Sequence, residues 1–312
     1  MTARKSGTLS QVWRDGIFDD KIVFCTGGNG SICSGQVRAL VALGANACIV
    51  GRNVEKTKAV AEDIALSRPG SKVLGIGGVD VRSLPDLEKA AKRCAEELGG
   101  IDFLIAGAAG NFLAPMHSLS VNGFKTVQEI DVQGSFNVTK ACLPYLIESA
   151  KRHVASRPSG RIIYVSTTNH YTGRPLQVHV NAAKAGVDAI SASVAIEYGP
   201  LGITSNVIAP GPISDTEGFN RLVKRWEPGQ EPWKKLPLGR WGLVKDIADA
   251  TVFLFSDAAN YVSGEVLVVD GASWRMGYGP GHDLPYPASV LPGSSIPDPN
   301  RPGDKSGSSS KL

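Results

Sequence analysis

The stretch KIVFCTGGNGSIC, residues 21–33, decides the fold of this chain. Its first six residues form a mostly apolar run of strand length, and the glycine cluster that follows leads into a helix-length segment, residues 32–43. Glycines between a strand and a helix let backbone N–H groups approach a pyrophosphate at the positive end of the helix. A glycine-rich turn without a ligand is the alternative interpretation. The predicted dinucleotide-binding loop consists of Thr26, Gly27, Gly28, Asn29, Gly30, Ser31 and Ile32.

Apolar runs and helix-length amphipathic segments alternate outward from this stretch along most of the chain. This βαβα alternation is typical of an α/β protein with a parallel sheet covered by helices on both faces. The expected strands cover residues 21–26, 47–50, 72–76, 103–106, 161–166, 204–208 and 265–269. The expected helices cover residues 32–43, about 121–152, 179–198 and 245–255, and two more begin at residues 54 and 84.

The composition divides the chain into three parts. An N-terminal extension (1–20) precedes a single domain (21–275), and 20 of the 36 residues from 277 to 312 are Pro, Gly or Ser. A segment of that composition cannot bury enough apolar surface to offset its chain entropy. We therefore expect residues 276–312 to form an extended, loosely held C-terminal tail.

Charge and cysteine content exclude several classes of protein. The 33 Lys and Arg residues against 29 Asp and Glu give a net charge of +4, too small for a strongly basic nucleic-acid binder. No apolar stretch is long enough for a transmembrane helix, so we expect no membrane partner. The five cysteines form no C-x-x-C pair, and their odd number predicts reduced thiols in an intracellular protein. The five histidines show no ligand spacing with Cys or carboxylates, so no metal site is expected.

The end of the second expected strand, Val50-Gly51-Arg52-Asn53, indicates which dinucleotide binds. An acidic residue at this point would accept hydrogen bonds from the ribose hydroxyls of NAD, and none is present. Arg52 offers instead a charged fork suited to a 2′-phosphate. The sequence therefore favours NADPH over NADH, with Arg52 and Asn53 beside the adenosine ribose. A solvated arginine at a strand end is the alternative interpretation.

Several markers follow one another in the order found in one enzyme family. They are the T-G-G-x-G loop, Asp80-Val81, Ala108-Ala109-Gly110, Lys184 in a long helix, and Asn206 followed by Pro210-Gly211. Over about residues 21–274 the chain resembles the short-chain dehydrogenases/reductases. The resemblance implies a doubly wound, seven-stranded parallel sheet of the Rossmann type and a homo-oligomer. It also implies cofactor contacts from Asp80, Val81, Ala108, Gly110, Lys184, Pro210, Gly211 and Ile213.

The chain departs from this family where the catalytic tyrosine is usual. The family motif Y-x-x-x-K corresponds to Val180 and Lys184, and a valine cannot donate a proton, so ordinary carbonyl–alcohol chemistry loses its acid. Thr167 stands at the family's serine position, and Asp131 replaces the asparagine of the family's fourth helix. In the glycine loop, Ser31 and Cys33 replace the last two glycines of the T-G-x-x-x-G-I-G pattern.

This set of replacements resembles one branch of the family, the peroxisomal 2,4-dienoyl-CoA reductases. Further matches are the segments 108–112, 176–179 and 209–218. The activity implied is NADPH-dependent reduction of a 2,4-dienoyl-CoA to a 3-enoyl-CoA, a step of peroxisomal β-oxidation of unsaturated fatty acids. The candidate catalytic residues are Asp131, Lys184 and, as a weaker proton relay, Asp270. Asp131 bonding backbone in a kinked helix, and Asp270 as an ordinary turn residue, are the alternatives.

The same resemblance implies an acyl-CoA site near the fourth strand, where a ligand crosses the sheet. Another peroxisomal NADPH-dependent reductase, such as a 2-enoyl-CoA reductase, and an inactive NADP-binding homologue remain alternatives. The last three residues, Ser310-Lys311-Leu312, match the signal that the peroxisomal import receptor reads, so we expect the peroxisome matrix as the location. The candidate substrate-binding residues are Arg82, Asn111, Phe112, Thr167 and Arg221.

Overall fold

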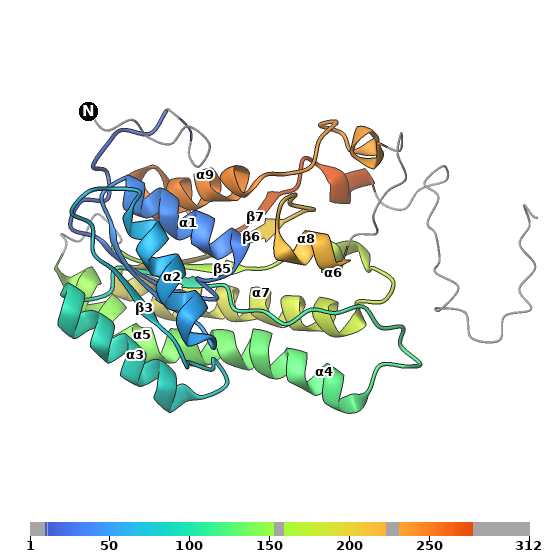
Figure 1. The fold of residues 1–312 in the computed structure, drawn as a ribbon, viewed down its shortest axis with the longest axis horizontal. Helices are drawn as coiled ribbons and strands as arrows, with labels where there is room; N and C mark the ends of the chain where they lie inside the picture. Colours follow the sequence, from blue (N-terminus) through green and yellow to red (C-terminus); the bar gives the residue numbers. More distant parts are fainter. Residues whose placement is uncertain (1–9, 11, 153–158, 223–230, 277–312) are drawn as a thin grey trace, which may run out of the picture.

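The computed structural model of the chain describes residues 10, 12–152, 159–222 and 231–276 (Figure 1). Seven parallel strands form one sheet in the order β3-β2-β1-β4-β5-β6-β7. This confirms the predicted doubly wound, Rossmann-type sheet. The strands are β1 (Ile22–Thr26), β2 (Asn46–Val50), β3 (Val73–Ile76), β4 (Phe103–Ala106), β5 (Gly160–Val165), β6 (Ile203–Pro210) and β7 (Val266–Val269).

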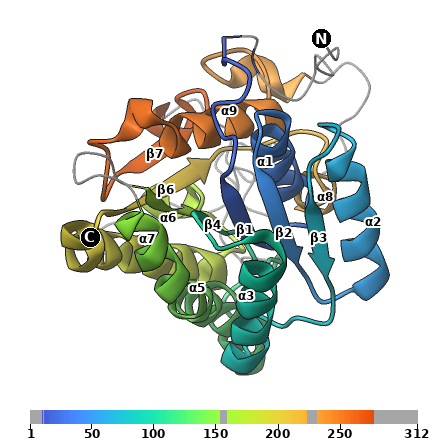
Figure 2. The ribbon, with the colours of Figure 1, turned by 90° about the vertical axis from the view of Figure 1, so that its left-hand side faces the viewer.

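Helices cover both faces of this sheet (Figure 2). The α-helices are α1 (Ser31–Ala42), α2 (Val54–Ala65), α3 (Leu84–Leu98), α4 (Val121–Gln128), α5 (Gly134–Lys151), α6 (Asn169–Thr172), α7 (Val178–Tyr198), α8 (Glu217–Leu222) and α9 (Val244–Phe255). A π-helical turn, η1 (Glu129–Gln133), joins α4 to α5. Short 3-10 helices are η2 (Gly199–Leu201), η3 (Pro232–Lys235), η4 (Asp257–Ala259) and η5 (Ser273–Met276). Within the described residues, no helix combines the length and hydrophobicity needed to cross a membrane.

The central strand β1 shows why the sheet is covered on both sides. All five of its residues are buried. Successive side chains of a strand point to opposite faces, so Val23 and Cys25 join the core under α1, α2 and α9, whereas Ile22 and Phe24 join the core under α3, α5 and α7. Parallel strands buried on both faces are near-continuous apolar runs, which is the pattern the sequence shows. The five cysteines are all free and buried, in agreement with the predicted thiols.

The helix expected over residues 121–152 differs from the structure. The chain forms α4 and α5 with the π turn between them. A π turn packs an additional residue into a helix and shifts the facing of the residues within it. The apolar periodicity of the segment continues across the turn, which is why the sequence indicated one uninterrupted helix. Asp131 lies in this turn and is fully buried.

The edge of the sheet depends on a close approach between α2 and β3 at Gly75. A Cβ atom at Gly75 would lie 2.8 Å from the carbonyl oxygen of Thr57 and 3.0 Å from the Cα atom of Lys58, both in the backbone of α2. Backbone atoms cannot swing aside as a flexible side chain can. The absence of a side chain at Gly75 therefore sets how closely α2 packs on the sheet.

We expect Gly75→Ala to lower the free energy of unfolding by about 1–3 kcal/mol, because the added methyl overpacks this contact. Urea unfolding of the purified protein measures the change. Gly218→Ala is the matched control: that glycine lies in helix α8 and has no atom within 4 Å of the position its Cβ would take. The control should be neutral or slightly stabilising. Equal stability of the two variants would contradict the close-packing argument.

Candidate active site

A cavity of about 830 Å³ opens where the carboxyl ends of the central strands meet. Its walls come from the loops after strands β1 to β6, together with η1 and α7. Strands β1 and β4 are neighbours, and the chain order reverses between them, so the cavity lies at the topological switch point where doubly wound sheets bind ligands. Its volume falls in the range of ligand and cofactor sites.

The structure brings most of the predicted site residues together at this cavity. From the glycine loop and the strand ends the lining includes Gly27, Asn29, Gly30, Ser31, Ile32, Arg52, Asn53, Asp80, Val81, Ala108 and Gly110. From the predicted substrate and catalytic groups it includes Asn111, Asp131, Thr167 and Lys184. These residues come from segments far apart in the sequence, which only the sheet topology places side by side.

The glycine loop has the shape needed to cradle a phosphate. Gly27 has a φ of +67°, and a Cβ atom there would lie 2.8 Å from the carbonyl oxygen of Gly107. Helix α1 begins directly after Gly30, so the N–H groups of its first turn face this end of the cavity. A side chain at Gly27 would collide with the backbone of Gly107 and Ala108, so glycine keeps the loop in this shape, and the N–H groups at the start of α1 fit a dinucleotide pyrophosphate.

Some predicted cofactor residues support the loop from behind and do not line the cavity. The hydroxyl of Thr26 accepts hydrogen bonds from the N–H groups of Gly107 (3.2 Å) and Ala108 (3.3 Å), which joins the ends of β1 and β4. A Cβ at Gly28 would lie 2.6 Å from the Cβ of Ile49. The other predicted residues outside the lining are Pro210, Gly211 and Ile213, at and after the end of β6.

At the end of β2, Arg52 is exposed and lies on the wall of the cavity. The side chain of Asn53 accepts a hydrogen bond from the N–H of Lys56 at 2.8 Å and so caps α2. Lys56 itself also lines the cavity and was not among the residues predicted from the sequence. Its position four residues after Arg52, on the first turn of α2, could have indicated it.

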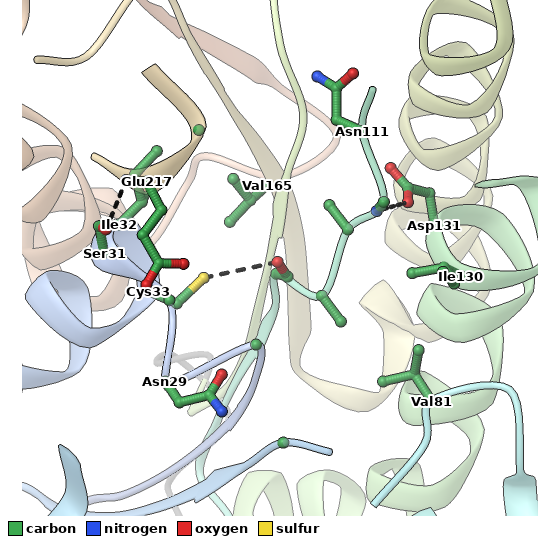
Figure 3. Close-up of a pocket in the computed structure, with 18 of the residues that line it drawn as sticks. Asn29, Ser31, Ile32, Cys33, Val81, Asn111, Ile130, Asp131, Val165 and Glu217 are labelled. Carbon is green, nitrogen blue, oxygen red and sulfur yellow. Dashed lines mark hydrogen bonds between the residues drawn. The ribbon is translucent and has the colours of Figure 1, made fainter. Parts of the chain in front are cut away.

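Asp131 and Lys184 form a buried ion pair in the wall of the cavity. The Nζ of Lys184 lies 3.0 Å from Oδ2 of Asp131 and also donates a 2.9 Å hydrogen bond to the carbonyl oxygen of Val165. The other carboxylate oxygen of Asp131 accepts a 2.7 Å hydrogen bond from the N–H of Gly110. Figure 3 shows the Asp131 carboxylate turned toward this backbone N–H, with Asn111 above it. The pair thus ties together η1, α7 and the loop after β4.

Val180 fills the position of the family's tyrosine with an apolar side chain. It is 3 % exposed, packs in a small cluster with Val127 and Ala183, and lines the cavity. The nearest tyrosine in sequence, Tyr171, donates its hydroxyl proton to Asp188 at 3.0 Å and does not line the cavity. Burial and the neighbouring Asp188 carboxylate raise the pKa of Tyr171 well above its usual value. No phenol therefore occupies the acid position among the described residues that line the cavity.

Asn111 presents an amide to the cavity. Its buried Oδ1 makes no hydrogen bond within the part of the chain that the structure describes, although the residue lines the cavity. Buried polar atoms are normally paired, so an amide in this position is available to a ligand. The ring of Phe112 points away from the lining and stacks on His179, with ring centroids 4.3 Å apart. Nε2 of His179 lies 3.0 Å from the carbonyl oxygen of Phe112 and fixes this loop, and burial lowers the pKa of His179.

Two further predicted residues, Asp270 and Arg82, do not line the cavity, and the side chain of a third is not described. Asp270 follows β7 and accepts hydrogen bonds from the hydroxyl of Ser273 (3.0 Å) and the N–H of Trp274 (2.9 Å), the role of a turn residue. Arg82 donates to both carboxylate oxygens of Asp80, and these hydrogen bonds lower the pKa of Asp80. Arg221 lies in α8, and its side chain is outside the described part of the structure.

Comparisons with known proteins agree with this geometry. A family model described as enoyl-(acyl carrier protein) reductase matches residues 27–272. A solved short-chain dehydrogenase from Bacillus anthracis is 34 % identical, with a TM-score of 0.71, over 84 % of this chain and 99 % of that one. Levodione reductase superposes with a TM-score of 0.74 at 28 % identity, over 83 % of this chain and 99 % of that one.

The chain belongs to the short-chain dehydrogenase/reductase family. It therefore has the fold of an oxidoreductase that binds a nicotinamide dinucleotide. Within the family it is 49 % identical to the peroxisomal 2,4-dienoyl-CoA reductase of Saccharomyces cerevisiae, over 89 % of this chain and 92 % of that protein. The enzyme of the same name from Danio rerio is 38 % identical over 85 % of each chain. Both relatives are described as (3E)-enoyl-CoA-producing, and the resemblance predicted from the residues is confirmed.

The buried pair makes a prediction about stability that does not depend on catalysis. Asp131→Asn or Lys184→Met alone leaves one charge buried and uncompensated, which costs roughly 3–5 kcal/mol in comparable pairs. The double variant removes both charges, so we expect it to lose clearly less stability than the two single losses added together. Urea unfolding of the four proteins completes the double-mutant cycle. Losses that add to within about 0.5 kcal/mol would show that the pair is not coupled.

Proposed function

We propose that this short-chain dehydrogenase/reductase reduces 2,4-dienoyl-CoA thioesters to 3-enoyl-CoA with NADPH. One observation carries the proposal: a buried carboxyl–ammonium pair, Asp131 and Lys184, stands at the cavity where Val180 replaces the usual phenol. The yeast and zebrafish relatives that carry this activity in their names support it. An ordinary carbonyl reductase of this family would need a proton-donating side chain at position 180.

The chemistry of a conjugated thioester explains why a phenol is not needed. When bound, NADPH supplies a hydride to the far end of the diene. The negative charge then spreads through the diene to the thioester oxygen, so the protein must stabilise an enolate oxygen and deliver a proton to the α-carbon. An alkoxide at the hydride-accepting carbon, which is what the family's tyrosine protonates, does not form.

The residues at the cavity divide these tasks. Asn111, which lines the cavity, can donate the N–H of its side-chain amide to the thioester oxygen, and Lys184 supplies a positive charge that lowers the energy of the developing anion. Asp131, ionised against Lys184 and bonded by the N–H of Gly110 in the free protein, takes up a proton from solvent and passes it through a water molecule to the α-carbon, which returns the carboxylate to its ion pair. Asp270 has no part in this scheme, because it does not line the cavity.

NADPH is the proposed cofactor because of the charge at the end of β2. Arg52 lies on the cavity wall, and no carboxylate follows β2 to bind a free 2′-hydroxyl. The phosphates of coenzyme A also need cations, and Arg52 and Arg221 remain the proposed partners, whereas Arg82 is engaged by Asp80. Thr167, which lines the cavity, completes the proposed acyl-CoA site, and Phe112 supports it from behind by packing on His179. A homo-oligomer is also proposed, on the family resemblance alone.

A 2-enoyl-CoA reductase is the second candidate, because the matching family model is described as an enoyl-(acyl carrier protein) reductase. The two activities differ in the substrate that accepts the hydride. We expect oxidation of NADPH with 2,4-hexadienoyl-CoA, and little with 2-hexenoyl-CoA, because the mono-enoyl chain has no extended diene. Absorbance at 340 nm measures the rate, NADH replaces NADPH as the cofactor control, and the isolated product identifies the enoyl isomer.

Turnover of the mono-enoyl substrate alone would favour the second candidate. Tight NADPH binding without turnover of either thioester would identify an inactive NADP-binding homologue. A rate with NADH equal to that with NADPH would contradict the role given to Arg52.

We expect Asp131→Asn to lower kcat with 2,4-hexadienoyl-CoA about 100-fold or more, because the amide cannot supply a proton. The substitution keeps the size of the side chain and an oxygen that can accept from Gly110. NADPH affinity, measured by fluorescence titration, is the control for a folded cofactor site and should change far less. Near-normal turnover would remove Asp131 from the mechanism.

The relatives from yeast, zebrafish and Arabidopsis thaliana are named peroxisomal, and we place this enzyme in the same compartment. The proposed import signal, Ser310-Lys311-Leu312, lies outside the described residues. Deleting these three residues should leave a fluorescently tagged protein diffuse in the cytosol, because the receptor no longer has its tripeptide. Microscopy of the full-length tagged protein is the control. Unchanged punctate import of the shortened protein would contradict the signal.

A further inference from the structure

Helix α8 is attached across the cavity to α2 by an ion pair. The Nζ of Lys56 lies 2.5 Å from Oε1 of Glu217, and the two residues are 161 positions apart in the chain. Both line the cavity. The ion pair is therefore part of the cavity wall.

A second, uncharged contact attaches the same residue. The backbone N–H of Glu217 donates a 3.2 Å hydrogen bond to the hydroxyl of Ser31, at the start of α1 (Figure 3). Ser31 is one of the two departures from the family's glycine pattern. A glycine at this position would have no hydroxyl to accept the bond. The departure thus gives the phosphate loop a direct connection to α8.

The topology of the sheet shows what these contacts bridge. Lys56 follows β2, whereas Glu217 follows β6, and β1, β4 and β5 lie between those two strands in the sheet. The contacts therefore connect the two halves of the doubly wound fold over the crevice at the switch point. Thr216 and Gly218, on either side of Glu217, also line the cavity. A ligand that extends from the glycine loop toward Arg52 is enclosed by this bridge.

We propose that the Lys56–Glu217 ion pair, together with the Ser31–Glu217 hydrogen bond, is a clasp that retains the dinucleotide. The proposal rests on the proposed function in one respect, that a dinucleotide occupies this cavity. The clasp acts on the enclosed ligand as a whole and is distinct from recognition of the 2′-phosphate by Arg52. It therefore slows release of NADH as well as NADPH.

The strength of the clasp suits a cofactor that must exchange in every catalytic cycle. The side chains of Lys56 and Glu217 are 42 % and 70 % exposed, so solvent screens their attraction. Exposed ion pairs of this kind change an equilibrium by about two- to fivefold. The clasp thus slows the release of the cofactor without trapping it.

The experiment measures dissociation rates of NADH and NADPH by stopped-flow displacement, with no acyl-CoA present. Lys56→Met and Glu217→Gln should each raise the rate about two- to fivefold for both dinucleotides, and Ser31→Ala should raise it as well. NADH is the diagnostic probe, because it lacks the phosphate that Arg52 would bind. Lys58→Met is the matched control: this lysine is exposed on the same helix, does not line the cavity, and should leave both rates unchanged.

Charge reversal separates the clasp from a direct phosphate contact. Lys56→Glu and Glu217→Lys should each speed NADH release, and the double reversal should restore it to within about twofold of the original rate. High salt should remove the difference between the original protein and Lys56→Met. A Lys56→Met effect confined to NADPH, or a double reversal that fails to slow NADH release, would overturn the clasp. Loss of turnover with dienoyl-CoA alone would overturn the proposed function and leave the clasp standing, whereas failure to bind either dinucleotide would overturn both.

Discussion

A single buried ion pair constrains the active-site end of this molecule. Asp131 is fully buried, and a carboxyl group in that position is costly unless charge and hydrogen bonds compensate it. Lys184 and the N–H of Gly110 supply that compensation from two other segments of the chain. The π turn, helix α7 and the loop after β4 are therefore held in one arrangement. Each of these three elements also contributes to the wall of the cavity.

The same pair connects the structure to its chemistry. In place of the family's tyrosine, Val180 closes one side of the cavity with apolar surface. The remaining polar groups, Asp131, Lys184 and Asn111, converge on the space beside it. A site with a positive charge, an amide and a carboxyl suits a reaction in which charge moves to a distant thioester oxygen and a proton returns to carbon. The loss of the phenol and the gain of the carboxyl are parts of one change.

Ser31 and Cys33, which replace two glycines of the family pattern, both make tertiary contacts. The hydroxyl of Ser31 accepts a hydrogen bond from Glu217, and the thiol of Cys33 donates to the carbonyl oxygen of Gly107 at 3.8 Å. Binding of a phosphate by the backbone N–H groups of the loop needs neither of these side chains. Ser31 joins the loop to α8, and Cys33 joins it to the end of β4. The binding loop, which follows β1 in one half of the sheet, is thus attached at two points to the other half.

The layered fold, the glycine loop and the family could be predicted from the amino-acid sequence alone. Those features depend on local patterns: apolar runs of strand length, glycines between β1 and α1, and a fixed order of short motifs. Arg52 could also be predicted, because it follows directly after a strand. The replacement at Val180 could be predicted from its spacing to Lys184. Asn111 was predicted correctly as a cavity residue for the same reason, since it follows β4.

Which polar groups meet depends on the packing of the sheet and its helices, and the sequence did not predict it. The apolar periodicity did not predict the π turn around Asp131, because the pattern of apolar residues continues across it. The buried ion pair of Asp131, which forms only in the folded protein, favours the turn. Asp270 and Arg82 looked available for catalysis and binding, yet neighbouring turn and carboxylate groups engage them. The sequence did not predict the contact between Lys56 and Glu217, because the two residues are 161 positions apart. The contact forms only when β2 and β6 are both part of the sheet. Long-range pairing depends on the packed sheet, and no local pattern encodes it.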